Sequence, residues 1–102
     1  MKITVICRVE PGCLGPDGAN HVEAFCKLGQ KEFDAIDPES IDWEIIPRFD
    51  KTKPEIQYQL KGRYLNEQQS ELYLKALGKD PEAFEEALFK QLTLSVNHYF
   101  GR

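Results

Sequence analysis

Apolar and polar residues alternate along the first stretch of the chain, from Ile3 to Val9. A period of two with β-branched residues is typical of a strand with one buried face. Ile6 adds an apolar side chain on the second face, so we expect this strand to lie inside a sheet. The same alternation returns at residues 41–45 and 56–60 and predicts two further half-buried strands.

The two later strands are predicted to pair with each other as an antiparallel hairpin. A register that places Trp43 opposite Tyr58 sets apolar residues opposite apolar residues and brings no like charges together. The connecting segment 47–54 contains Pro54 and two lysines, which suit the exposed end of a hairpin.

Apolar residues recur every three or four positions between His21 and Asp37, which predicts a helix with one buried stripe. Asn20 is expected to cap its start, because Glu23 stands three residues later at the capping-box position. Pro38 is expected to end it, since the residue before a proline avoids the helical region.

Two further helices are predicted in the second half of the chain. Asn66 can cap the first of them, with Gln69 at the capping-box position, and Gly78 suits its end. Asp80 and Pro81 start the other, because proline is well accommodated at the first helical position.

The predicted order is therefore β-α-β-β-α-α, in one α+β domain that spans residues 1–102. We expect a three-stranded mixed sheet with the helices packed on one face. This order resembles part of a split β-α-β arrangement. A similarity of fold at this level carries no function.

Composition narrows the class of protein. A chain that is 41% hydrophobic and 29% charged is typical of globular proteins rather than disordered ones. Its net charge of −4 disfavours nucleic acid as a general partner. No apolar run approaches the ~20 residues of a membrane helix, and the start does not resemble a signal peptide, so we expect a cytoplasmic location and no membrane partner. The odd count of three cysteines fits reduced thiols.

The segment between the first strand and the first helix, residues 11–20, is the first candidate site. A Gly-rich loop before a helix can bind phosphate, because backbone N–H groups and the helix dipole face the anion. Its G-x-x-G-x-x-G spacing matches neither a dinucleotide fingerprint nor a P-loop, and Asp17 would repel an anion, so a purely structural loop is the main alternative. The residues assigned to this ligand site are Gly12, Cys13, Gly15, Asp17, Gly18, Asn20 and His21.

Thiol chemistry is the second candidate. Cys7, Cys13, His21 and Cys26 are ligand types that zinc favours, but their spacing matches no compact metal motif, so no metal is predicted. Cys7 and Cys26 fall on apolar stripes, which favours core packing. Cys13 precedes a helix N-terminus, a position that can lower a thiol pKa and make the thiolate reactive.

Two charged segments are further candidates. The acidic residues between 32 and 44 could bind a hard cation, but they lack the order of an EF-hand loop, so a solvated surface is expected. The basic segment around the predicted hairpin could receive a nucleic-acid strand, although only Phe49 and Tyr64 supply aromatic rings there. Its basic residues are Arg48, Lys51, Lys53, Lys61 and Arg63.

No nucleophile elbow, zincin helix or paired-carboxylate motif appears, and His98 has no partner implied by the sequence, so no catalytic residue and no cofactor is predicted. The leading hypothesis is a non-enzymatic module that binds a protein partner or itself. It is motivated by Phe89 and Leu94, which lie outside the main apolar stripe of the last helix. The alternative is a protein that binds a small ligand or anion, or is thiol-active, through the loop 11–20 and Cys13. A weaker alternative is single-stranded nucleic-acid binding through the basic hairpin.

Overall fold

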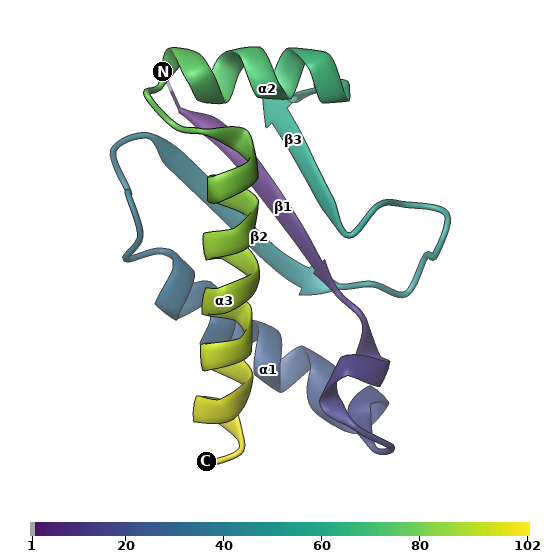
Figure 1. Ribbon diagram of the computed structural model, residues 1–102. Coiled ribbons are helices and arrows are strands. Elements are labelled where there is room, and N and C mark those ends of the chain that lie inside the picture. Colours follow the sequence, from purple (N-terminus) through teal and green to yellow (C-terminus); the bar gives the residue numbers. More distant parts are fainter. Residues whose placement is uncertain (1) are drawn as a thin grey trace.

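The computed structural model describes residues 2–102, which form an α+β fold with three α-helices and a four-stranded mixed sheet (Figure 1). The strands are β1 (Ile3–Val9), β2 (Ile41–Pro47), β3 (Ile56–Leu60) and β4 (Arg63–Tyr64). The helices are α1 (Gly18–Phe33), α2 (Glu67–Ala76) and α3 (Pro81–Tyr99), and a short 3-10 turn, η1 (Pro11–Leu14), precedes α1. The predicted fold class is confirmed, and the sheet has one strand more than predicted.

The strand order is β2-β1-β3-β4, so the first strand lies between the two strands that were predicted to form a hairpin. β1 pairs in parallel with β2 and antiparallel with β3, which places Val5 opposite both Trp43 and Tyr58. The predicted hairpin is therefore wrong, although Trp43 and Tyr58 do lie on the same face. β1 is largely buried on both faces, as Ile6, only 2% exposed on the second face, shows, and this suits its place inside the sheet.

The comparison with a split β-α-β arrangement is also wrong. In a split arrangement another strand separates the two parallel strands, whereas β1 and β2 are hydrogen-bonded neighbours here. The segment 48–55 then crosses the end of β1 to start β3 on its other side.

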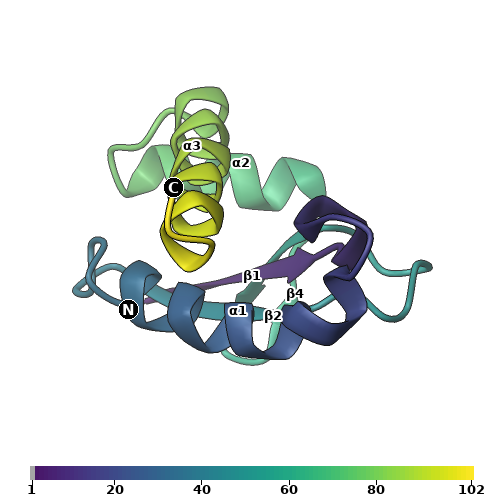
Figure 2. The same ribbon diagram turned by 90° about the horizontal axis from the view of Figure 1, so that it is seen from below.

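Both long helices contact the face of the sheet that carries Trp43. The Trp43 ring lies 5.0 Å from Phe33 of α1 and 5.9 Å from Phe84 of α3, measured between ring centroids. α1 runs alongside β2 at the sheet edge, α3 crosses in front of the strands, and α2 lies across their end (Figures 1 and 2). The fully buried apolar residues include Ile3, Val5, Cys7, Val9, Val22, Phe25, Phe33 and Leu74.

The start of α1 is earlier than predicted. The helix begins at Gly18 rather than after Asn20. A Cβ atom added to Gly18 would lie 1.7 Å from the carbonyl oxygen of Pro11, so only glycine lets η1 pack against the first helical turn. The helix ends at Phe33, and Asp37, its predicted end, has a left-handed φ of 46°.

The predicted helix signals of the second half are confirmed. The side chain of Asn66 accepts a hydrogen bond from the Gln69 amide, and the Gln69 side chain accepts one from the Asn66 amide. The side chain of Asp80 accepts from the Ala83 amide at the start of α3, and Gly78 has a φ of 79° after α2.

The opposite face of the sheet is mostly polar, and Ile6 and Arg8 of β1 are buried on it. Arg8 is only 5% exposed, and its Nη1 donates to the carbonyl oxygen of Pro54 (2.9 Å) and to Oε1 of Gln57 (2.7 Å). These bonds fasten the segment 48–55 across the end of β1. None of the helices in residues 2–102 is long and apolar enough to cross a membrane.

Candidate functional site

Two of the three glycines of the predicted ligand loop, Gly15 and Gly18, are required by the conformation and packing of the loop itself. Gly12 and Cys13 lie in η1, and the Gly15 amide donates to the Gly12 carbonyl oxygen at 3.3 Å. Gly15 has a φ of 94°, a conformation that favours glycine, and the Gly18 amide donates back to Gly15 at 3.0 Å. Asp17 occupies the N-cap of α1 without a side-chain hydrogen bond. The structural alternative accounts for Gly15 and Gly18, whereas an added Cβ atom at Gly12 would meet nothing within 4 Å.

His21 does not join the loop residues in one site. Its Nδ1 lies at hydrogen-bond distance, 3.0 Å, from the hydroxyl of Tyr99, and its ring meets Phe100 edge-on at 5.3 Å. His21 therefore belongs to the contact between α1 and α3, while Asn20 is exposed on the first turn. The open hollow beside the loop is completed by Phe100 and by Arg102, whose guanidinium lies 5.1 Å from the Phe100 ring centroid.

The three thiols differ in burial: Cys7 and Cys26 are buried, and Cys13 is exposed. Burial raises the pKa of Cys7 to about 12, and burial likewise raises the pKa of Cys26 to about 11. Cys13 is exposed and free. Within residues 2–102 no group of three or more cysteines, histidines and carboxylates is arranged to hold a metal ion, so Cys7, Cys13, His21 and Cys26 are not brought together as ligands.

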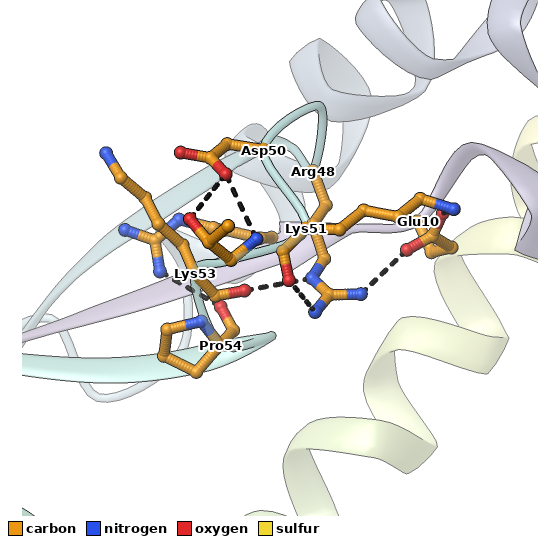
Figure 3. A network of polar contacts seen from close by, with 8 residues as sticks. Glu10, Arg48, Asp50, Lys51, Lys53 and Pro54 are labelled. Atoms are coloured by element: carbon orange, nitrogen blue, oxygen red, sulfur yellow. Dashed lines mark hydrogen bonds and ion pairs between the residues drawn. The ribbon is translucent and has the colours of Figure 1, made fainter.

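Two of the five basic residues of the predicted nucleic-acid segment, Arg48 and Lys51, are engaged in contacts within the protein. Arg48 donates from Nη1 to Oε2 of Glu10 (2.9 Å), and from Nε and Nη2 to the carbonyl oxygens of Lys53 and Lys51, at 3.1 and 3.2 Å (Figure 3). Lys51 adds a second ion pair to Glu10 at 3.1 Å. These two partners, Lys51 and then Arg48, hold the pKa of Glu10 below its ordinary value. The segment 48–55 is therefore a connection from β2 to β3, held by these ion pairs and hydrogen bonds, rather than the end of an open hairpin.

The acidic run between residues 32 and 44 is dispersed over several contacts. Asp37 pairs with Lys79, Asp42 pairs with Lys2, and Glu32 accepts from Nδ1 of His98 at 2.6 Å. These carboxylates stabilise different parts of the fold and do not converge on one cation.

A pocket of about 340 Å³ opens between the end of α1, the start of β2 and the inner side of α3. Its volume lies at the small end of the range for ligand sites, about 300–1,000 Å³. Its lining residues are Phe33, Ile36, Asp37, Ile41, Trp43, Lys79, Phe84, Ala87, Leu88 and Gln91. Most of this lining is aliphatic or aromatic.

Trp43 organises the wall of this pocket, which we call the Trp43 pocket. Its ring is stacked on Phe84 with an interplanar angle of 11° and is tilted against Phe33. Its Nε1–H donates to the carbonyl oxygen of Ile36 at 2.9 Å, so the polar atom of the indole is already satisfied. The indole can therefore offer the pocket only apolar surface.

The polar groups of the Trp43 pocket are few. Lys79 and Asp37 form an ion pair, which leaves the lining without net charge, and Gln91 supplies one amide. Two apolar side chains at or next to the pocket are exposed to solvent. Ile36 is 36% exposed, and Leu94, one turn beyond Gln91 on α3, is 55% exposed. The expected excess of apolar surface on the last helix is thus present.

Sequence reasoning missed this pocket, although its parts were visible. Phe33, Trp43 and Phe84 were each placed on an apolar stripe, where they read as core residues. α1 ends at Phe33, and the pocket opens beyond that end, where Ile36 and Asp37 of the following segment line it. The sequence predicted that the helix ends before Pro38, at Asp37, and gave no sign of an end four residues earlier.

Comparison of the chain with family models, with curated proteins and with solved structures gave no significant match.

Proposed function

We propose that this protein is a non-enzymatic interaction module that takes an apolar anchor side chain of a partner protein into the Trp43 pocket. The observation that carries the proposal is the chemistry of this pocket: apolar walls, a satisfied indole and a neutralised ion pair. Binding energy at protein interfaces is concentrated in a few such buried anchors, often aromatic. A volume of about 340 Å³ suits one aromatic or branched aliphatic side chain together with its neighbours.

A protein partner fits these features better than a polar small molecule. Sites for polar ligands place several hydrogen-bonding groups so that they converge on the ligand. In the Trp43 pocket the polar side chains are few and already engaged: Asp37 pairs with Lys79, and Nε2 of Gln91 donates to Oγ of Ser95 at 3.2 Å. Ile36 lines the pocket and is partly exposed, and Leu94, one turn beyond Gln91, extends the apolar surface past the pocket, as the region around an anchor does in an interface.

The two alternatives receive less support from the contacts. Gly18 and Gly15 of the loop 11–20 are explained by the approach of Pro11 to Gly18 and by the turn at Gly15. The side chains of Arg48 and Lys51, which a nucleic-acid strand would need, are paired with Glu10. We therefore propose no second function.

Selection of peptides from a displayed random library tests the proposal. The bait is the full chain, and the selected peptides are then measured against Ala87→Phe, which places a ring in the Trp43 pocket. Ala83→Phe is the matched control, because Ala83 is exposed one turn earlier on α3 and does not line the pocket. We expect peptides that share one aromatic or leucine residue, with at least tenfold weaker binding to Ala87→Phe alone.

Two results would contradict the proposal. One is the absence of any enriched peptide, and the other is equal binding of the selected peptides by Ala87→Phe and by the wild-type chain.

A further inference from the structure

The outer edge of β3 is paired along only part of its length. β4 pairs with Gln59 and Leu60, and the Leu65 amide donates to the Tyr58 carbonyl oxygen at 2.9 Å, where the pairing ends. The Arg8 amide donates to the Glu55 carbonyl oxygen, which directs residue 55 toward β1. Since backbone groups alternate in direction along a strand, the N–H and C=O of Ile56 point outward. No strand within residues 2–102 lies beside them.

A groove begins at this unpaired edge and continues between α2 and α3. It consists of two hollows of about 280 and 230 Å³ that share Tyr58, Glu67, Ser70 and Glu85 in their linings. Ile56 and Leu65 lie at the end next to the strand edge. Figure 1 shows α2 across the carboxyl end of β3 and α3 to one side of the strand.

The charged side chains that line the groove are all acidic. Its carboxylates are Glu67, Glu71, Glu82 and Glu85, and no lysine, arginine or histidine is among its lining residues. None of these four glutamates forms an ion pair in the part of the chain that the structure describes. Glu67 and Glu82 stand in the first turns of their helices, where the helix dipole accounts for them. Glu71 and Glu85 lie a turn or nearly a turn further along their helices, where the helix dipole does not explain the presence of a carboxylate.

An exposed aromatic side chain adjoins the groove. Phe89 follows Glu85 by four residues on α3, so both side chains lie on the same side of the helix, and Phe89 is 43% exposed. The hydroxyl of Tyr58 donates to Oε2 of Glu85 at 2.9 Å, which holds that carboxylate beside the strand. A ligand along β3 would therefore meet unpaired backbone groups, apolar side chains and carboxylates together.

We propose that the β3 edge and this groove bind a basic, extended peptide segment of a partner protein, which adds to the sheet as a strand beside Ile56. Backbone hydrogen bonds to Ile56 supply affinity that does not depend on sequence, and alternate side chains supply specificity. Lysine or arginine side chains of the peptide pair with Glu67, Glu71 and Glu85, and a β-branched residue packs on Ile56 and Leu65. A second copy of this chain fits less well, because its net charge is −4.

The test uses the full chain and a synthetic acetylated heptapeptide of alternating lysine and valine, titrated by calorimetry at low and at physiological salt. We expect saturable binding that weakens with added salt and is absent for the matching glutamate–valine peptide. Glu85→Gln and Glu71→Gln should each weaken binding at least threefold. Glu86→Gln, an exposed neighbour outside the lining, should leave it unchanged.

Backbone methylation of the peptide separates strand addition from simple charge attraction. Methylating the amides of one set of alternate residues should abolish binding, while methylating the other set should leave it within twofold. Equal effects of the two methylated peptides, or an absence of saturable binding, would overturn the proposal. So would self-association of the wild-type chain that Glu85→Gln abolishes, because the occupant would then be a second copy. Ala87→Phe should not affect this peptide, so the test is independent of the Trp43 pocket.

Discussion

The side chain of Gln30 binds the backbone of β2 at Trp43 as a neighbouring strand would. Its Nε2 donates to the Trp43 carbonyl oxygen at 2.7 Å, and its Oε1 accepts from the Ile45 amide at 2.8 Å. β2 is an edge strand, and unpaired edges invite association with other chains. One glutamine of α1 thus closes part of the edge and holds the helix beside Trp43.

Replacing Gln30 by alanine should destabilise the fold and expose this edge. Two backbone groups lose their partners, so we expect a loss of about 1–3 kcal/mol in the free energy of unfolding. Denaturant unfolding measures the loss, and light scattering measures any gain in self-association. Lys27→Ala is the control, since Lys27 is exposed on the same helix. Equal stability of the two variants would show that the bonds of Gln30 contribute nothing.

The loop 11–20 offers a second matched pair. Gly18→Ala brings a Cβ atom against the Pro11 carbonyl oxygen, so we expect a loss of more than about 2 kcal/mol in stability. Gly12→Ala has nothing within 4 Å of the added atom and should change stability by less than about 1 kcal/mol. Thermal and denaturant unfolding of both variants compares them. A harmless Gly18→Ala would contradict the close contact between η1 and α1.

The thiols should differ in reactivity with a disulfide reagent at pH 8. Burial raises the pKa values of Cys7 and Cys26, so both should stay protonated and protected, while the exposed Cys13 reacts. We expect one fast thiol in the native protein and three after unfolding, and Cys13→Ser should remove the fast one. Rapid reaction of all three native thiols would contradict the packing of Cys7 and Cys26.

Acid should weaken the ion pairs that Glu10 forms with Arg48 and Lys51. Because Lys51 and Arg48 lower the pKa of Glu10 in the folded state, its ion pairs stabilise the fold fully above the ordinary value of about 4.3. This contribution is lost as the pH falls through the lowered pKa. We expect Glu10→Gln to reduce the dependence of unfolding free energy on pH below about 4.3, whereas the exposed control Glu39→Gln should not. Equal pH dependence of the wild type and Glu10→Gln would show that the ion pairs of Glu10 do not stabilise the fold.

Local signals in the sequence predicted most elements, because each depends on residues close together in the chain. Alternation marked the strand of Val5, and the capping pair of Asn66 and Gln69 marked the start of α2. Strand order depends instead on contacts between distant segments. The register that paired Trp43 with Tyr58 was self-consistent, yet both residues pair with Val5, which the pattern of each strand alone could not show.

The candidate site was harder to predict than the fold. Glycine spacing drew attention to the loop 11–20, but the carbonyl of Pro11 that requires Gly18 is visible only in three dimensions. The Trp43 pocket joins α1, β2 and α3, and its apolar lining residues, such as Phe33 and Trp43, looked like ordinary core residues in their own segments. The pocket opens beyond the end of α1, and the sequence predicted that end four residues too late.

The most direct test of the Trp43 pocket follows the indole Nε1–H resonance of Trp43, the one tryptophan of the chain, while a display-selected peptide is added. A saturable shift of this resonance is predicted for the wild type and for Ala83→Phe, with at least tenfold weaker saturation for Ala87→Phe. A peptide that saturates the protein while the Trp43 resonance stays in place would contradict binding in this pocket.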